Sequence, residues 1–185
     1  MRNESIPLLF SVACLSWLGS PAAFGEKATG SRKEVGIVSN IKILSEYVDD
    51  VSDVEAWKAS FLKPDMTDRE KAVAVWNSVV QFRHQDVPPK EFLHEDLCVH
   101  DPIKTFNVYG YGQCCCSASN VEALARAAGL NARGRELRGH TVPEVEWKQD
   151  WHMLDASLIS YFIDARGDVA SVNEIAKEVR TWLAA

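Results

Sequence analysis

Three side chains that together can perform acyl transfer occur in the order cysteine, histidine, aspartate. Cys114 follows a glycine-lined turn, and His140 and Asp155 come later, at the ends of short strand-like runs. A thiol is a weak nucleophile near neutral pH, but an imidazole that takes its proton and a carboxylate that orients the imidazole activate it. These residues predict a cysteine enzyme with a Cys114, His140, Asp155 triad.

The thiol belongs to a cysteine triplet, Cys114 to Cys116, in the run YGYGQCCCSA. The first turn of a helix favours a thiolate, because its backbone N–H groups are unpaired and the helix dipole is positive there. Successive helical side chains diverge by about 100°, so only one of the three thiols faces a given histidine. Gly112 lets the backbone approach a substrate, and with Tyr109 and Tyr111 it forms the candidate substrate-binding set.

Two alternatives concern other histidines and thiols. His152 competes for the role of base, but strand alternation places it on the face opposite Trp151 and Met153, which favours a structural position. A zinc site formed by Cys98, His100 and the triplet is conceivable, yet the chain has no C-x-x-C pair, the spacing typical of such sites. No metal or other cofactor is therefore expected.

The N-terminus has the features of a secretory signal peptide. A basic start, an apolar run over 6–18 and small residues up to Gly25 predict cleavage after residue 25 and a secreted, periplasmic or cell-envelope protein. The apolar run is too short to span a bilayer comfortably, so no membrane association is expected after cleavage. The formal net charge is −6 and no Lys/Arg cluster occurs, which disfavours nucleic acid as a partner.

Export would place the remaining cysteines in an oxidising compartment, where disulfides form. Adjacent cysteines bridge each other only with strain. A bond from Cys98 to Cys115 or Cys116 is therefore expected, and it leaves Cys114 free. The competing expectation is that Cys98 is a buried free thiol.

Periodicity predicts the elements that position these residues. Residues 26–66 are expected to form an N-terminal helical extension, with helical spacing over 35–48 and 54–62, and residues 67–185 the main domain. The expected elements of that domain are a helix opened by the capping box at 67–70, a loop over 90–108, a helix from 117 to a stop at Gly129, strands at 132–137, 141–147 and 151–154, and a capped helix after Ser171. The last two strands form a hairpin, whose outer ends bring His140 beside Asp155.

The chain resembles the transglutaminase-like superfamily of papain-like cysteine enzymes over about residues 67–155. That family places its nucleophile four residues before an alanine and fifteen before a helix-ending glycine, which implies Cys114. The resemblance also implies an α+β fold in which N-terminal helices, including the nucleophile helix, pack on a small antiparallel sheet. The matching residues are Gly112, Cys114, Ala118, Arg126, Gly129, Ala132, Arg133, Gly139, His140, Glu144 and the run WHMLD at 151–155.

The triad and the resemblance together imply a secreted enzyme that attacks an amide or peptide carbonyl and forms a thioester. Water is the default acceptor of the acyl group, and the expected partner is a protein or peptide amide substrate. The alternative is a non-catalytic cell-envelope or surface binding domain, with the same fold and oxidised cysteines. The oligomeric state stays open.

Overall fold

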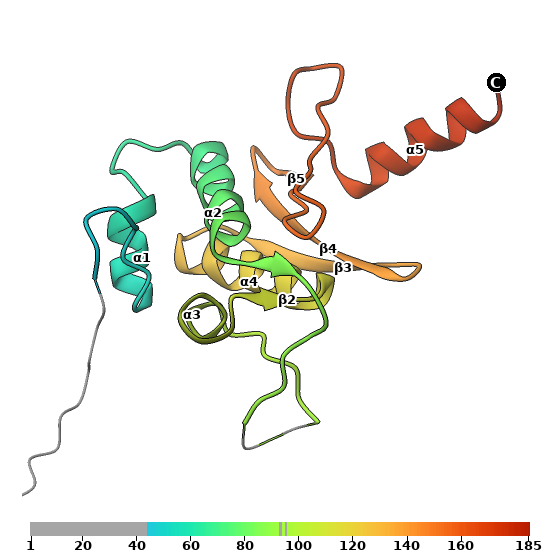
Figure 1. The fold of residues 1–185 in the computed structure, drawn as a ribbon. Coiled ribbons are helices and arrows are strands. Elements are labelled where there is room, and N and C mark those ends of the chain that lie inside the picture. Colours follow the sequence, from blue (N-terminus) through green and yellow to red (C-terminus); the bar gives the residue numbers. More distant parts are fainter. Residues whose placement is uncertain (1–43, 93, 95) are drawn as a thin grey trace, which may run out of the picture. The chain divides into compact units, whose positions relative to one another are not determined.

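The computed structural model describes residues 44–92, 94 and 96–185, so the predicted signal peptide and the first part of the helical extension lie outside the described residues. All the elements described below belong to one compact unit, residues 41–185. This unit is α+β, with small sheets (Figure 1). Its elements are α1 (Val54–Phe61), α2 (Asp68–Phe82), β1 (His84–Gln85), α3 (Pro102–Lys104), the π-helix η1 (Thr105–Tyr109), β2 (Tyr111–Gly112), α4 (Cys114–Ala127), β3 (Ala132–Leu137), β4 (His140–Trp147), β5 (Asp150–Met153) and α5 (Val172–Leu183).

The larger sheet is antiparallel, with the strand order β3-β4-β5, and the three predicted strands are confirmed. Strand β4 begins at His140, which pairs with Leu137 across a tight turn. The turn from β4 to β5 contains Lys148 and Gln149, both with positive φ, as expected for a two-residue hairpin turn. A second, parallel pair joins β1 to β2, with Gln85 opposite Gly112.

Helix α2 begins where the sequence predicts. The Thr67 side chain accepts a hydrogen bond from the backbone of Glu70, and the Glu70 carboxylate accepts one from the backbone of Thr67, which completes the capping box. The apolar stripe of this helix is buried in the main core at Ala72, Val75 and Val79. The exposed capping box therefore fixes where the helix starts, and the apolar stripe fixes which face of the helix packs against the core.

Helix α4 packs on β3, β4 and α2 and forms the centre of the core. Val121 and Leu124 are completely buried, and burial of each such side chain stabilises the fold by about 1.5–3 kcal/mol. The helix stops at Gly129, whose φ of +84° is the left-handed conformation that glycine adopts without strain. The predicted stop is confirmed.

Two segments differ from the sequence prediction. Residues 45–48 form a turn closed by a Ser45–Val48 bridge, because the Ser45 hydroxyl accepts the Tyr47 backbone N–H and competes with the helix. The predicted loop 90–108 contains α3 and η1 at its end. Asp101 caps α3, with Pro102 as the first helical residue, and these are local start signals for a helix.

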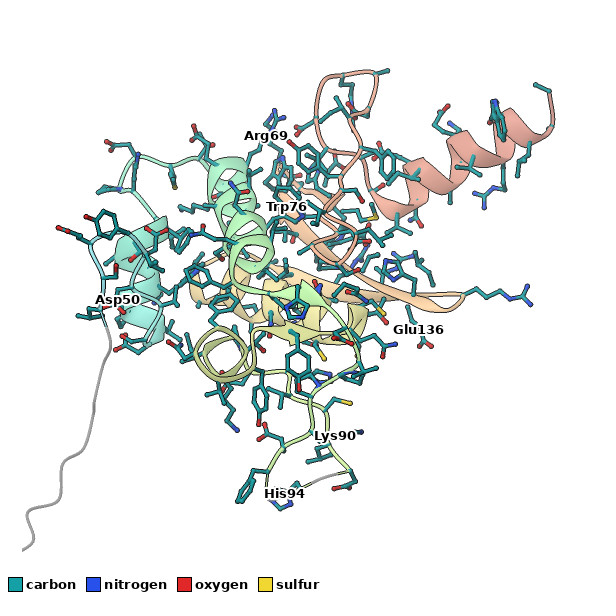
Figure 2. All side chains as sticks on the ribbon, viewed as in Figure 1. Asp50, Arg69, Trp76, Lys90, His94 and Glu136 are labelled. Carbon is teal, nitrogen blue, oxygen red and sulfur yellow. The ribbon has the colours of Figure 1, made fainter. Side chains whose placement is uncertain are left out.

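The segment after β5 is held against α2 by two side chains (Figure 2). Trp76 packs edge-on against Tyr161, with ring centroids 5.3 Å apart. Arg69 Nε lies 3.7 Å from a carboxylate oxygen of Asp168. The final helix α5 begins at a second capping box, at Ser171 and Glu174, as predicted. Among the described helices, none has the length and apolar character needed to cross a membrane.

Candidate active site

Cys114 is the first residue of α4, which confirms the predicted helix start for the triplet. Gln113, the N-cap residue, makes no side-chain capping bond, so the first-turn N–H groups are not covered by a cap. Gly112 is buried, and a Cβ there would lie 2.9 Å from Cys116 Cβ. This glycine is therefore required by the close packing of the turn on its own helix.

His140 and Asp155 meet across the hairpin, as the sequence predicts. His140 Nε2 lies 2.6 Å from Asp155 Oδ2. The carboxylate is only 2% exposed, and its other oxygen accepts hydrogen bonds from the Ser157 backbone and hydroxyl, both at 2.8 Å, and from the Leu158 backbone at 3.1 Å. An ionised carboxylate only accepts, so His140 Nε2 is the donor and Nδ1 is left as the basic nitrogen.

The Cys114 thiol and the His140 ring each shift the pKa of the other, so the two side chains lie close together. Partial burial opposes the thiolate, but hydrogen bonds from the Thr141 backbone and from His140, with the positive charge of the imidazolium, outweigh it and lower the pKa of Cys114. Burial likewise opposes the imidazolium, whereas Asp155 and Cys114 favour it and raise the pKa of His140. Both shifts favour a thiolate and imidazolium pair.

Two residues near the triad carry no signal in the sequence. Arg83 ends α2 and is 5% exposed, and its Nη1 donates to the Gly112 carbonyl at 2.9 Å. The Arg83 guanidinium also donates to Gln85 Oε1, at 3.0 and 3.2 Å. Burial lowers the pKa of Arg83, and negative charge on Cys116 and on the triad opposes that shift, so a cation lies close to the site. Only the long-range pairing of β1 with β2 brings these residues here.

The two predicted substrate-binding tyrosines lie beside the turn that leads to the thiol. Tyr109 and Tyr111 are half-buried, and their rings meet edge-on with centroids 6.3 Å apart. Tyr111 also lies 5.8 Å, centroid to centroid, from the His84 ring. The three rings therefore form a small aromatic group, which includes residues of the turn that precedes Cys114 in the chain.

His152, the competing histidine, is 2% exposed and lies in the structural core. Its ring stacks on Trp147 with centroids 3.5 Å apart, and its nitrogens contact the carbonyls of Val169 and Trp147. Both nitrogens thus have backbone partners away from the triad. The structural position predicted from strand alternation fits these contacts.

Glu144 and Arg133 form a structural ion pair. Glu144 is completely buried, and its Oε2 accepts from Arg133 at 2.7 and 2.9 Å. Its Oε1 accepts the Val172 backbone N–H at 2.9 Å, which ties β4 to the first turn of α5. The guanidinium of Arg133 also covers the Trp151 ring at 3.9 Å. This pair supports the strand that begins with His140.

The expected disulfide is absent from the described residues, where Cys98 and all three triplet cysteines are free thiols. Cys98 Sγ instead lies 3.6 Å from Lys90 Nζ. Burial raises the pKa of Cys116 to about 11, in contrast to the lowered pKa of Cys114. His100, Cys115 and Cys116 converge so that their candidate ligand atoms lie within 4.8 Å of one another. They are the described residues best suited to hold a metal ion.

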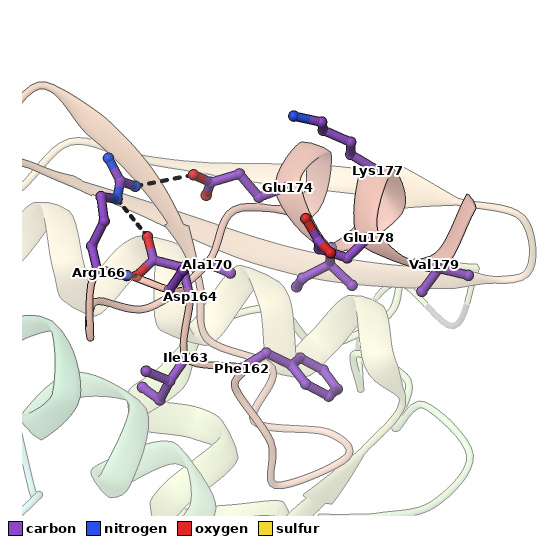
Figure 3. A pocket seen from close by; sticks show the side chains of 11 residues that line it. Phe162, Ile163, Asp164, Arg166, Ala170, Glu174, Lys177, Glu178 and Val179 are labelled. Carbon is purple, nitrogen blue, oxygen red and sulfur yellow. Dashed lines mark hydrogen bonds and ion pairs between the residues drawn. The ribbon is translucent and has the colours of Figure 1, made fainter. Parts of the chain in front are cut away.

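A recess lies between the segment after β5 and α5 (Figure 3). It has a volume of about 620 Å³ and is formed by residues 162–170 and the exposed face of α5. Phe162, Ile163 and Val179 line it, and an Asp164–Arg166–Glu174 ion-pair network borders it. Cys114, His140 and Asp155 do not line this recess, so its shape carries no information about the triad's substrate.

Comparisons were made with protein-family models, with curated proteins and with solved structures, and none of them matches this chain.

Proposed function

We propose that the protein is a cysteine-dependent enzyme of transglutaminase-like type, which acts on amide or peptide bonds through Cys114. One observation carries this proposal. His140 contacts Asp155 at 2.6 Å, and the thiol that raises the pKa of His140 belongs to the first residue of a helix. A base beside the thiol and a carboxylate that fixes the tautomer and orientation of that base together activate a cysteine.

The reaction runs in two balanced halves. His140 Nδ1 takes the Cys114 proton, and the sulfur attacks the carbonyl carbon to give a tetrahedral oxyanion. The intermediate collapses with cleavage of the C–N bond, and the amine leaves with the proton from His140. Water then attacks the thioester, with His140 as base, which releases the carboxylic acid and restores the Cys114 thiol.

Two groups are suited to stabilise the oxyanion. The backbone N–H of Cys114 belongs to the first helical turn, where no intrahelical acceptor is available. Gln85 lies opposite Gly112 in the parallel pair, and Arg83 binds its amide oxygen. The Gln85 NH₂ group is therefore free of that contact and suited to donate to the developing charge.

The substrate class proposed is a protein or peptide amide, with Tyr109 and Tyr111 as apolar contacts beside the scissile bond. Hydrolysis is the favoured outcome, because water is abundant and no group of the described site is arranged to select an amine. The sequence features of a signal peptide support action outside the cytoplasm, in the envelope or the medium. The competing function is a binding domain without chemistry, whose thiols are oxidised.

Trapping the acyl-enzyme tests the proposal. The chain from residue 26 is incubated with a peptide amide library and with a thiol-directed electrophile at mildly acidic pH, and adducts are located by peptide mapping. We expect acylation and alkylation at Cys114, loss of both in Cys114→Ala, and strong reduction in His140→Ala. Cys115→Ala is the matched control and should keep both reactions. Adducts that move to another cysteine, or no adduct with fully reduced protein, would refute the proposed function.

A further inference from the structure

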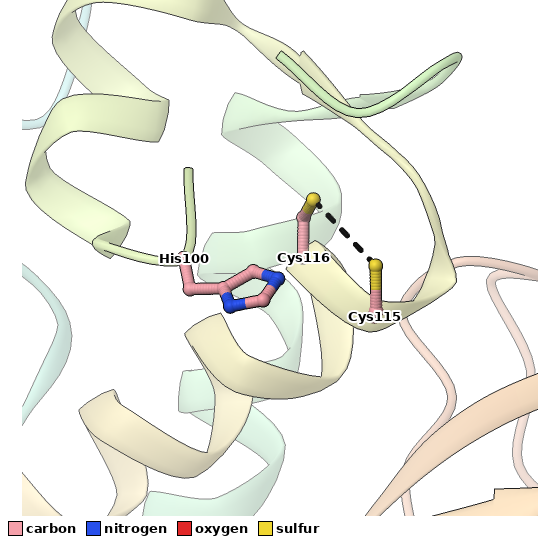
Figure 4. Close-up of side chains that lie close together, drawn as sticks. All are labelled: His100, Cys115 and Cys116. Carbon is pink, nitrogen blue, oxygen red and sulfur yellow. Dashed lines mark hydrogen bonds between the residues drawn. The ribbon is translucent and has the colours of Figure 1, made fainter. Parts of the chain in front are cut away.

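One group of metal-ligating side chains lies outside the triad (Figure 4). Cys115 and Cys116 come from the first turn of α4, and His100 comes from the segment just before α3. Cys116 is completely buried, Cys115 is half-buried and His100 is exposed. The three side chains therefore extend from the buried core to the protein surface.

The spacing of these atoms suits tetrahedral zinc. Zn–S bonds of about 2.3 Å at the tetrahedral angle place two sulfurs about 3.8 Å apart. Cys115 Sγ and Cys116 Sγ are 3.9 Å apart. The His100 nitrogen, at no more than 4.8 Å from the sulfurs, reaches a Zn–N bond with a small rotation of an exposed side chain.

We propose that His100, Cys115 and Cys116 bind a zinc ion, with water in the fourth position. Two thiolates and an imidazole are donors that zinc prefers, and binding releases the two thiol protons to solvent. His100 is well placed for this, because its neighbour Val99 is completely buried and donates its backbone N–H to the Pro89 carbonyl. The exposed imidazole thus extends from an anchored stretch of backbone.

The ion would cross-link two segments that are distant in sequence. Among the described residues of 90–101, the contacts with neighbouring segments include the Glu91–Lys104 ion pair, the bond from the Tyr109 hydroxyl to the Lys90 carbonyl and the backbone bond from Val99 to Pro89. A zinc ion at Cys115 and Cys116 would fasten this stretch to the start of α4. The site is separate from the proposed chemistry, since the three converging residues include none of Cys114, His140 and Asp155.

Metal titration of the reduced chain from residue 26 tests the inference. Co²⁺ serves as a spectroscopic probe, and Zn²⁺ affinity is measured by competition with a chromophoric chelator. We expect one ion per chain, a thiolate-to-cobalt charge-transfer band and the intense visible bands of tetrahedral Co²⁺. His100→Ala and Cys115→Ser should each weaken Zn²⁺ binding by at least about 100-fold, since even second-shell changes cost 10–100-fold. Cys114→Ala and Cys98→Ser are the matched controls and should bind as the wild type does.

Three results would overturn the inference. The first is the absence of a thiolate band in fully reduced wild-type protein. The second is unchanged affinity in both His100→Ala and Cys115→Ser. The third is loss of binding in Cys114→Ala, which would assign the metal to the proposed nucleophile. None of these readouts uses enzymatic activity, so the zinc site and the proposed function fail or stand separately.

Discussion

The single carboxylate of Asp155 performs two tasks, one with each oxygen. Oδ2 contacts the histidine, while Oδ1 is occupied by the Ser157 and Leu158 donors that hold the carboxylate in place. Two of these donors are backbone N–H groups and the third is the Ser157 hydroxyl, so the orientation of Asp155 depends on residues no more than three positions away in the chain. The His140 imidazole is consequently held in a fixed orientation in the free protein.

Replacement of Asp155 by asparagine separates orientation from packing. The amide keeps an oxygen for the Ser157 donors, but its NH₂ group faces His140 Nε2 and reverses the tautomer, so that Nδ1 carries the proton. We expect kcat/KM for an amide substrate to fall by about 100-fold or more, with little change in thermal stability. Steady-state kinetics and thermal unfolding measure the two effects. Activity equal to that of the wild type would remove Asp155 from the mechanism.

At the scale of elements, the core and the triad follow from patterns within the chain, whereas the supporting contacts do not. The capping box at Thr67, the glycine stop after α4 and strand alternation each depend on a few neighbouring residues, and each prediction is confirmed. The sequence does not predict the positions of Arg83 and Gln85, because the pairing of β1 with β2 brings them to the site. Strands of two residues are too short to give a recognisable sequence pattern. Helical spacing predicts a helix at 45–48, but the hydrogen bond from the Tyr47 backbone to the Ser45 hydroxyl favours a turn there.

Glu144 links two elements, and its charge is expected to matter for stability. In Glu144→Gln the shape is kept but the charged hydrogen bonds to Arg133 are lost, and such bonds contribute about 1.5–3 kcal/mol. We expect the free energy of unfolding to fall by about 2 kcal/mol in denaturant titrations. Glu146→Gln, on the same strand with an exposed bond to Asn131, is the control and should change it by less than about 0.5 kcal/mol. Equal effects of the two changes would contradict the linking role of Glu144.

For the molecule as a whole, the histidine couples stability to pH. The folded pKa of His140 is raised, so the folded state holds its proton more tightly than the unfolded chain does. The stabilisation is then fully present below the ordinary histidine pKa of about 6.5 and is lost as the pH rises through the raised value. The lowered pKa of Cys114 makes the folded state more stable as the pH rises, which opposes the effect of His140. Cys114 must therefore be replaced before the effect of His140 is measured.

The test compares two proteins, the Cys114→Ala variant and the double variant that carries both Cys114→Ala and His140→Gln. We expect the difference in unfolding free energy between these two proteins to be largest near pH 5 and to shrink on the alkaline side, where His140 is neutral in both states. Denaturant titrations over this pH range measure it. A difference that stays constant with pH would show that the contact with Asp155 does not favour the imidazolium.

The triad lies within one continuous stretch, from the start of α4 through the β4–β5 hairpin to Asp155. Each connection in that stretch is a short turn, so little loop-closure entropy opposes bringing the three side chains together. Contacts between segments close in sequence also tend to form early in folding. The three side chains of the proposed triad can thus assemble as one folding unit, and chain insertions outside residues 114–155 can vary the surroundings of the site while the arrangement of these side chains is kept.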